Sequence, residues 1–214
     1  MALWRRLRLL ALALCVLAPG LGVAQSYEVL LKAVNRGDIK VVGELLDQGL
    51  DPNTADGEGN TLLMTASRLG HRDLVVFLIE RKASVKRRSP HGDTALMFAS
   101  LKGQLAVARL LVEHGAEVTH GGWTPLHYAS FEGGAELVKF LIEKGADKNG
   151  LAPNGFTPLM LAARSGQLEA ARALLHEDAD FKIKGPKGES ALGIARALKN
   201  AELEVLLKRA GAVD

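Results

Sequence analysis

An alanine and a leucine recur along this chain at a nearly constant spacing. The positions are Ala33, Ala66, Ala99, Ala129, Ala162 and Ala195, and Leu45, Leu78, Leu111, Leu141, Leu174 and Leu207. The steps in both series are 33, 33, 30, 33 and 33 residues. A repeat of this length indicates small supersecondary units that bury their apolar faces against their neighbours. The chain is therefore predicted to fold as a stack of such units.

The most complete copy of the repeat covers residues 122–147 and begins Gly-Trp-Thr-Pro-Leu-His-Tyr. Thr124 is a good N-cap and Pro125 suits the first helical position, so we expect a helix to begin here. Gly133 is predicted to form a left-handed turn to a second helix, which Gly145 then ends. The apolar stripe of the second helix consists of Leu137, Val138, Leu141 and Ile142.

This copy resembles the ankyrin repeat, and the same pattern covers almost everything after the first two dozen residues. The threonine position is filled by Thr61, Thr94, Thr124, Thr157 and Ser190, and the turn glycine by Gly37, Gly70, Gly103, Gly133 and Gly166. The resemblance implies an all-α ankyrin-repeat solenoid of six helix-turn-helix units joined by short β-hairpin loops. We place the units near residues 27–58, 59–91, 92–121, 122–154, 155–187 and 188–214.

Three departures from the pattern lead to further expectations. Lys82 stands where Gly49, Gly115, Gly145 and Gly211 end their second helices, so it must adopt a left-handed conformation or reshape the turn, at a cost of about 1 kcal/mol. Lys199 stands where the last turn glycine belongs. The single 30-residue step falls between Gly115 and Trp123, which predicts a shortened hairpin between the third and fourth repeats.

The N-terminus has the three regions of a secretory signal. Arginines at positions 5, 6 and 8 precede an apolar run at 9–18, and small residues flank the expected cleavage site after Ala24. Spanning a membrane takes about 20 apolar residues, and this run is broken at Pro19 and Gly20. We expect residues 1–24 to be a cleavable signal peptide and 25–214 to be the repeat domain. The mature protein would be periplasmic in a bacterium, with eukaryotic secretion as the alternative.

Removal of the signal changes the charge of the chain. The whole sequence has 27 lysines and arginines against 24 acidic residues, and the three arginines of 1–24 leave 24 against 24. A neutral protein without a nucleic-acid-binding motif is not expected to bind nucleic acid. Cys15, the only cysteine, leaves with the signal, so stability must come from repeat packing. We expect a monomer.

Sequence motifs for catalysis or cofactor binding are missing. There is no phosphate-binding loop, no Gly-x-Ser-x-Gly elbow and no His-Glu-x-x-His pair. His114, His120 and His127 are close in sequence, but no cysteine is near, and His127 fills a repeat position where histidine hydrogen-bonds across repeats. We expect no enzyme activity, no cofactor and no metal.

Protein binding is the natural function of such a solenoid. The resemblance implies that exposed variable residues precede the threonine and the turn glycine of each repeat. The first set is Asn60, Asp93, Trp123, Phe156 and Glu189, and the second is Arg68, Leu69, Leu101, Lys102, Phe131, Glu132, Arg164 and Ser165. Aromatic and arginine anchors are typical of interface hot spots. The candidate partner-binding residues are therefore Trp123, Phe131, Phe156, Leu101, Lys102, Arg68, Leu69, Glu132 and Arg164.

Two alternatives stay open at this point. Phe156 either binds a partner or packs against the neighbouring hairpin. A basic patch, formed by Arg81, Lys82, Lys86, Arg87 and Arg88, either binds an anionic envelope surface or is an ordinary solvated loop. The sequence thus predicts an exported, non-catalytic adaptor, inhibitor or stabilising partner of another protein. An envelope-associated structural protein is the alternative, and an enzyme or small-ligand binder is less favoured.

Overall fold

The structure is a computed structural model that describes residues 19–213. The charged and apolar regions of the predicted signal, residues 1–18, lie outside the described residues. The part described forms twelve helices: α2 (Pro19–Arg36), α3 (Ile39–Asp47), α4 (Leu62–Leu69), α5 (Arg72–Glu80), α6 (Ala95–Leu101), α7 (Leu105–Glu113), α8 (Pro125–Glu132), α9 (Ala135–Glu143), α10 (Pro158–Arg164), α11 (Leu168–His176), α12 (Ala191–Ala197) and α13 (Ala201–Arg209).

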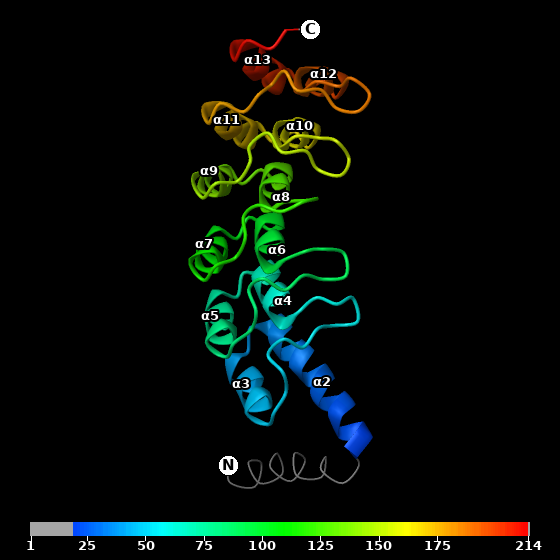
Figure 1. The fold of residues 1–214 in the computed structure, drawn as a ribbon, viewed down its shortest axis with the longest axis vertical. Helices are drawn as coiled ribbons and strands as arrows, with labels where there is room; N and C mark the ends of the chain where they lie inside the picture. Colours follow the sequence, from blue (N-terminus) through cyan, green and yellow to red (C-terminus); the bar gives the residue numbers. More distant parts are fainter. Residues whose placement is uncertain (1–18, 214) are drawn as a thin grey trace.

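The helices form six pairs that are stacked along one axis (Figure 1). The first helices of the pairs, from α2 to α12, lie in one column and pack in sequence order. The second helices, from α3 to α13, form the other column. Loops project on the side away from the second helices (Figure 1), and we call them fingers one to five in chain order.

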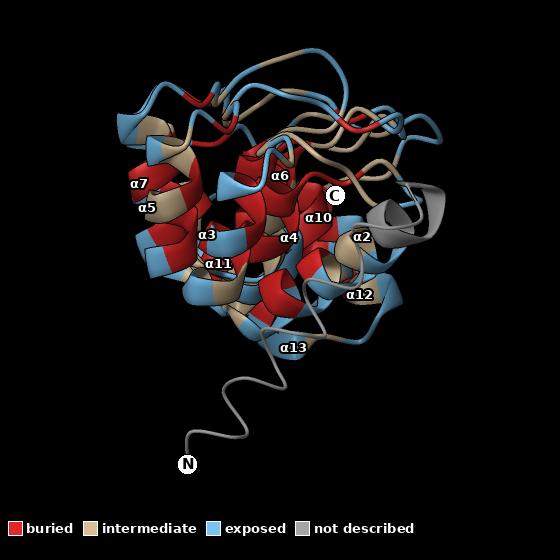
Figure 2. Cartoon of the chain, turned by 90° about the horizontal axis from the view of Figure 1, so that it is seen from below, coloured by how far each residue is buried: buried red, intermediate tan, exposed pale blue. Residues whose placement is uncertain are grey.

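The periodic alanines and leucines form the core of this stack. All twelve are buried, and ten of them have no exposed surface; the other two, Ala33 and Leu45 of the first repeat, are 5% and 6% exposed. Figure 2 shows buried residues on the helix faces that meet and exposed residues on the outer edges and loops. The spacing of these two residue types therefore predicted the packing surface correctly.

The ends of the helices follow the predicted capping. The side chain of Thr124 accepts a hydrogen bond from the His127 N–H, and the four equivalent residues cap their own helices in the same way. Gly133 and Gly145 have φ of 92° and 91°, as predicted for left-handed turns. Lys82 adopts φ 69°, so the first of its two alternatives is confirmed. Lys199 (φ 56°) is left-handed too.

Four of the five fingers are closed by a backbone hydrogen bond of hairpin type. These bonds are Asp56 N–H to Asn60 O, Ser89 N–H to Asp93 O, Ala152 N–H to Phe156 O and Gly185 N–H to Glu189 O, at 2.8 to 2.9 Å. Finger three, between α7 and α8, has no equivalent bond among the described residues and extends less far in Figure 1, as its 30-residue step predicted. In the described part, the fingers form no strands and one isolated antiparallel bridge, between Ala55 and Thr61.

The N-terminal helix differs from expectation in where it begins. Pro19 and Gly20 do not break it, because α2 starts at Pro19, and proline is well accepted in the first helical turn. Tyr27 is the first residue with a described bond to finger one, where its hydroxyl donates to Ala55 O at 2.7 Å. Leu30 is the first fully buried side chain. None of the helices described here combines the length and the apolar character that crossing a bilayer requires.

Candidate functional site

The first helices end in a row that crosses the repeats on one side of the stack. Because each helix is fixed at its start by its Thr or Ser cap, the residues before the turn come to equivalent places in successive repeats. We call this the helix-end row, and its members are the predicted residues Arg68, Leu69, Leu101, Lys102, Phe131, Glu132, Arg164 and Ser165.

A groove of about 720 Å³ lies between the fourth and fifth repeats on this row. The sequence predicted five of its lining residues, namely Trp123, Phe131, Glu132, Arg164 and Ser165. The remaining lining residues, Asn154, Leu161 and Gln167, were not foreseen. The groove lies beside the shortened finger three, which carries Trp123.

Trp123 is half-buried against two side chains of its own repeat. Its ring lies 5.9 Å from that of His127 in an edge arrangement and 5.7 Å from that of Tyr128. The Tyr128 hydroxyl donates to Asp93 Oδ1 in finger two, at 3.1 Å. Burial and the neighbouring Asp93 carboxylate raise the pKa of Tyr128 to about 12. Trp123 therefore has a packing role in addition to lining the groove, and Asp93 is engaged within the fold.

Phe131 and Phe156 have different environments. Phe131 is 44% exposed at the end of α8 and lines the groove. Phe156 packs against the core, and a Cβ built on Gly185 of finger five would lie 3.1 Å from its Cε1 atom. The guanidinium of Arg164 lies 5.6 Å from the centre of the Phe156 ring. Of the two alternatives for Phe156, the structure thus has its ring packed against the neighbouring hairpin, where it supports Arg164.

The other half of the helix-end row lies outside the groove. Arg68 lies with its guanidinium 5.8 Å from the Phe98 ring centre, and Leu69 is 41% exposed. Lys102 is exposed and Leu101 is half-buried. The row therefore crosses repeats two to five, and the groove lies at its fourth and fifth repeats.

Two predicted finger positions are less available than the pattern suggested. Asn60 was expected to be exposed and is only 7% exposed, because its amide donates to the carboxylates of Asp56 and Glu58 in the same tight finger. Glu189 accepts a hydrogen bond from the Lys187 N–H with one carboxylate oxygen. The sequence pattern gave no sign of these local bonds.

His127 links the start of α8 to finger four, which leads to the fifth repeat. The Thr124 N–H donates to its Nδ1 at 3.1 Å, and its Nε2 lies 3.0 Å from Gly150 O and donates to it. Burial lowers the pKa of His127, although the Gly150 carbonyl acts in the opposite direction. Gly150 lies in finger four, within the predicted bounds of the fourth repeat (122–154), so this bond joins α8 to the finger of its own repeat and does not cross to another repeat. Among the described residues, no group of three or more acidic, histidine or cysteine side chains is placed to hold a metal ion.

The basic patch is partly neutralised. Arg81 pairs with Asp47 at 2.6 Å and Arg88 pairs with Glu117 at 3.3 Å, in each case across neighbouring repeats. The other members, Lys82, Lys86 and Arg87, are exposed and form no ion pair in the part of the chain described here. Two of the five predicted charges of the patch are therefore paired, and the other three stay available to an anionic surface or to solvent.

The comparisons agree with the observed fold. The family model described as "Ankyrin repeats (3 copies)" matches residues 30–121 and 119–185, which together are well over half of the chain. The crystal structure of the human ASB11 ankyrin repeat domain is similar over 86% of this chain and 84% of that chain, with a TM-score of 0.80 and 26% identity. The predicted all-α solenoid of six helix pairs is thereby confirmed.

Curated relatives match shorter segments. Serine/threonine-protein kinase 12 of Arabidopsis thaliana is 35% identical over 88 residues, which are 41% of this chain and 19% of that protein. Ankyrin repeat and SAM domain-containing protein 6 of Mus musculus is 39% identical over 90 residues, 40% of this chain and 10% of that protein. Ankyrin repeat-containing protein P1E11.10 of Schizosaccharomyces pombe is 34% identical over 88 residues, 41% of each. The chain thus spans less than half the length of these relatives.

Proposed function

This chain belongs to the ankyrin-repeat family, and from that premise we propose that it is an exported, non-catalytic module that binds another protein through the groove between its fourth and fifth repeats. In this role it acts as an adaptor, an inhibitor or a stabilising partner of an exported protein. Ankyrin repeats typically serve protein–protein interaction, and the stacked repeats provide an extended surface for it.

The exposure of Phe131 in the groove is the observation that carries the proposal. A phenyl ring 44% exposed beside Trp123 and Leu161 is costly in water unless a partner covers it. Arg164 and Glu132 provide charges at the same place. Aromatic and arginine side chains grouped in one hollow are the residues that dominate binding energy in protein interfaces.

Catalysis is not part of the proposal because the groups with shifted pKa values near the groove are already used by the fold. His127 bonds to Gly150, and Tyr128 bonds to Asp93. The relatives whose names denote enzymes match this chain through its repeats only. The residues that line the groove include no nucleophile paired with a base.

Export to the periplasm, or secretion, is supported by the signal-like sequence of residues 1–24 and by the cysteine-free mature chain. The predicted cleavage site also lies two residues before Tyr27, which is the first described anchor of α2 to finger one. Cleavage there would remove the first six residues of α2 and keep Tyr27 and the buried Leu30. An anionic envelope surface, bound by the basic patch, is the alternative partner, although Arg81 and Arg88 are already paired.

Affinity capture with matched variants tests the proposal. The tagged full-length gene product is purified from the compartment in which it accumulates, together with Phe131→Ala and Val205→Ala variants. Val205 is the control because it is 47% exposed, similar to Phe131, but lies on α13 in a separate apolar groove of about 350 Å³. The proposal predicts that a partner protein is captured by the wild type and by Val205→Ala, and is lost with Phe131→Ala. Equal capture by all three would refute it.

A further inference from the structure

We infer that the bound segment of the partner carries a large apolar anchor with acidic side chains on both sides of it. This inference rests on the proposed function and specifies the chemistry of the partner. It follows from the charges along the helix-end row rather than from the groove alone.

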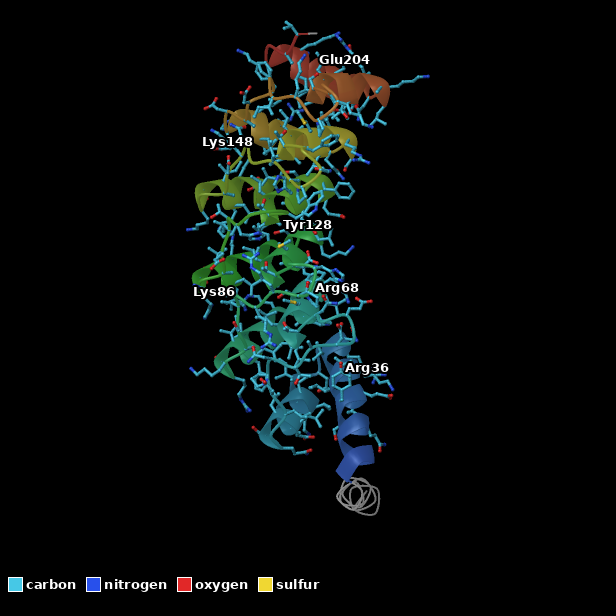
Figure 3. The ribbon with its side chains drawn as sticks, turned by 45° about the vertical axis from the view of Figure 1, so that its right-hand side comes forward. Arg36, Arg68, Lys86, Tyr128, Lys148 and Glu204 are labelled. Atoms are coloured by element: carbon cyan, nitrogen blue, oxygen red, sulfur yellow. The ribbon has the colours of Figure 1, made fainter. Side chains whose placement is uncertain are left out.

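A cation stands at the end of five of the six first helices. Arg36 ends α2, Arg68 lies in the last turn of α4, Lys102 follows α6, and Arg164 ends α10. The fifth, Arg196 of α12, is paired with Glu204. Glu132, at the end of α8, is the single acidic residue in these positions among the described helices. With Arg36 counted as an extension of the helix-end row and the paired Arg196 left out, four cations and one carboxylate give a net charge of 4 − 1 = +3. In Figure 3, Arg36 and Arg68 lie on the same side of the stack as Tyr128, while Lys86 lies on the other side.

These four cations have no carboxylate partner. None of them forms an ion pair within the described residues, whereas several cations elsewhere do, as in the pairs Arg81–Asp47 and Lys139–Glu136. A surface with a local excess of one charge attracts and orients partners of the opposite charge. Residues 25–214 have 24 cationic and 24 acidic side chains, so this excess is local to the row, as a second excess is local to Lys82, Lys86 and Arg87 of the basic patch.

Two of the four cations are held in place by aromatic rings. The guanidinium of Arg68 lies 5.8 Å from the Phe98 ring centre, and that of Arg164 lies 5.6 Å from the Phe156 ring centre. Stacking on a ring leaves the N–H groups at the guanidinium edge free to donate, and a side chain that is already ordered loses less freedom on binding. Both arginines are therefore prepared for paired hydrogen bonds to a carboxylate.

The groove divides these charges into two groups. Arg164 lies at the groove itself, beside Phe131, whereas Lys102 and Arg68 lie one and two repeats before it. An apolar anchor that contacts Phe131 thus has a cation on each side along the row. Glu132 stands next to the anchor position and repels a carboxylate there, so the acidic side chains must flank the anchor at a distance.

Selection of peptides on the full chain tests this inference. The probe is a phage-displayed library of random peptides, and the peptides enriched by the wild-type protein are synthesised and their affinities measured. The inference predicts aromatic or aliphatic anchors with Asp or Glu on both sides, and binding that weakens as NaCl is raised. The double charge reversal Arg68→Glu, Lys102→Glu should weaken binding by about tenfold or more.

The basic patch provides the matched control, because Lys86→Glu, Arg87→Glu makes the same change of charge on the other side of the stack. This control should leave the affinity unchanged. Peptides without acidic residues, or equal loss in both reversals, would overturn the inference. If peptides without acidic residues still need Phe131 for binding, the proposed function stands and only the acidic character of the partner is refuted. If no peptide is enriched, or if none of the enriched peptides needs Phe131, both the proposed function and this inference fail.

Discussion

Replacing Gly133 with alanine tests how the turn of the fourth repeat is coupled to the groove. Gly133 has φ 92°, and an L residue in this left-handed conformation costs about 1–2 kcal/mol. A Cβ here would also lie 2.3 Å from Gln167 Oε1 and 2.7 Å from Gln167 Cδ. The Gln167 side chain lines the groove, so it has to leave its position or its preferred rotamer, which adds about 0.5–1.5 kcal/mol.

Gly145 is the matched control for this substitution. Its φ is 91°, and a Cβ there would meet nothing within 4 Å. Gly145→Ala should therefore lower the free energy of unfolding by the backbone cost alone, about 1–2 kcal/mol, and Gly133→Ala by more. Urea denaturation followed by circular dichroism measures both values. In a Gln167→Ala background the difference should disappear. Equal destabilisation by the two alanines in the wild-type background would refute the reasoning.

Three further predictions concern export, ionisation and packing. The native protein should begin at Gln25 or within a few residues of it by mass spectrometry, and an intact initiator methionine would contradict export by a cleaved signal. The pKa of Tyr128, measured by NMR of ¹³C-labelled tyrosine, should be about 12 and should fall in the Asp93→Asn variant. Because the folded pKa is above the usual value of 10.0, Tyr128 should stabilise the fold below pH 10 and lose that contribution as the pH rises toward 12. Trp123→Ala should destabilise the protein by about 1–2 kcal/mol more than Phe131→Ala in urea melts, because only the tryptophan ring packs on two neighbouring rings; an equal effect would mean that this packing contributes little.

Much of the fold could be predicted from the sequence because the framework depends on local chemistry. A threonine cap, a turn glycine and an apolar stripe act within one repeat, and a constant period places them in line with their equivalents. Lys82 shows where local chemistry is not sufficient. The sequence allowed either a left-handed lysine or a reshaped turn, and the observed φ of 69° shows that the lysine is left-handed. Asp178 likewise adopts a left-handed conformation in the turn after α11, with φ 57°, and this was not predicted from the sequence.

The candidate site was predicted less completely because it depends on contacts between repeats. Phe131 and Arg164 could be placed on the groove from their positions before the turn. Leu161 and Gln167 could not be placed there from the sequence, because lining the groove depends on how the fourth and fifth repeats pack against each other.

The ion pairs within the basic patch were not predicted for a related reason. Arg81 meets Asp47 only through the stacking of two repeats, although the two residues are 34 positions apart. A comparison of residues one period apart would have revealed this pair, since 34 is close to the repeat length.

Photocrosslinking at position 131 tests the central claim most directly, namely that this solenoid binds a protein partner in the groove between its fourth and fifth repeats. The protein carries p-benzoylphenylalanine in place of Phe131, or in place of Val205 as a control of similar exposure, and is irradiated in living cells of its source. The account predicts a discrete crosslinked protein from position 131 and none of the same mass from position 205. Crosslinks of equal intensity from both positions, or from position 205 alone, would contradict it.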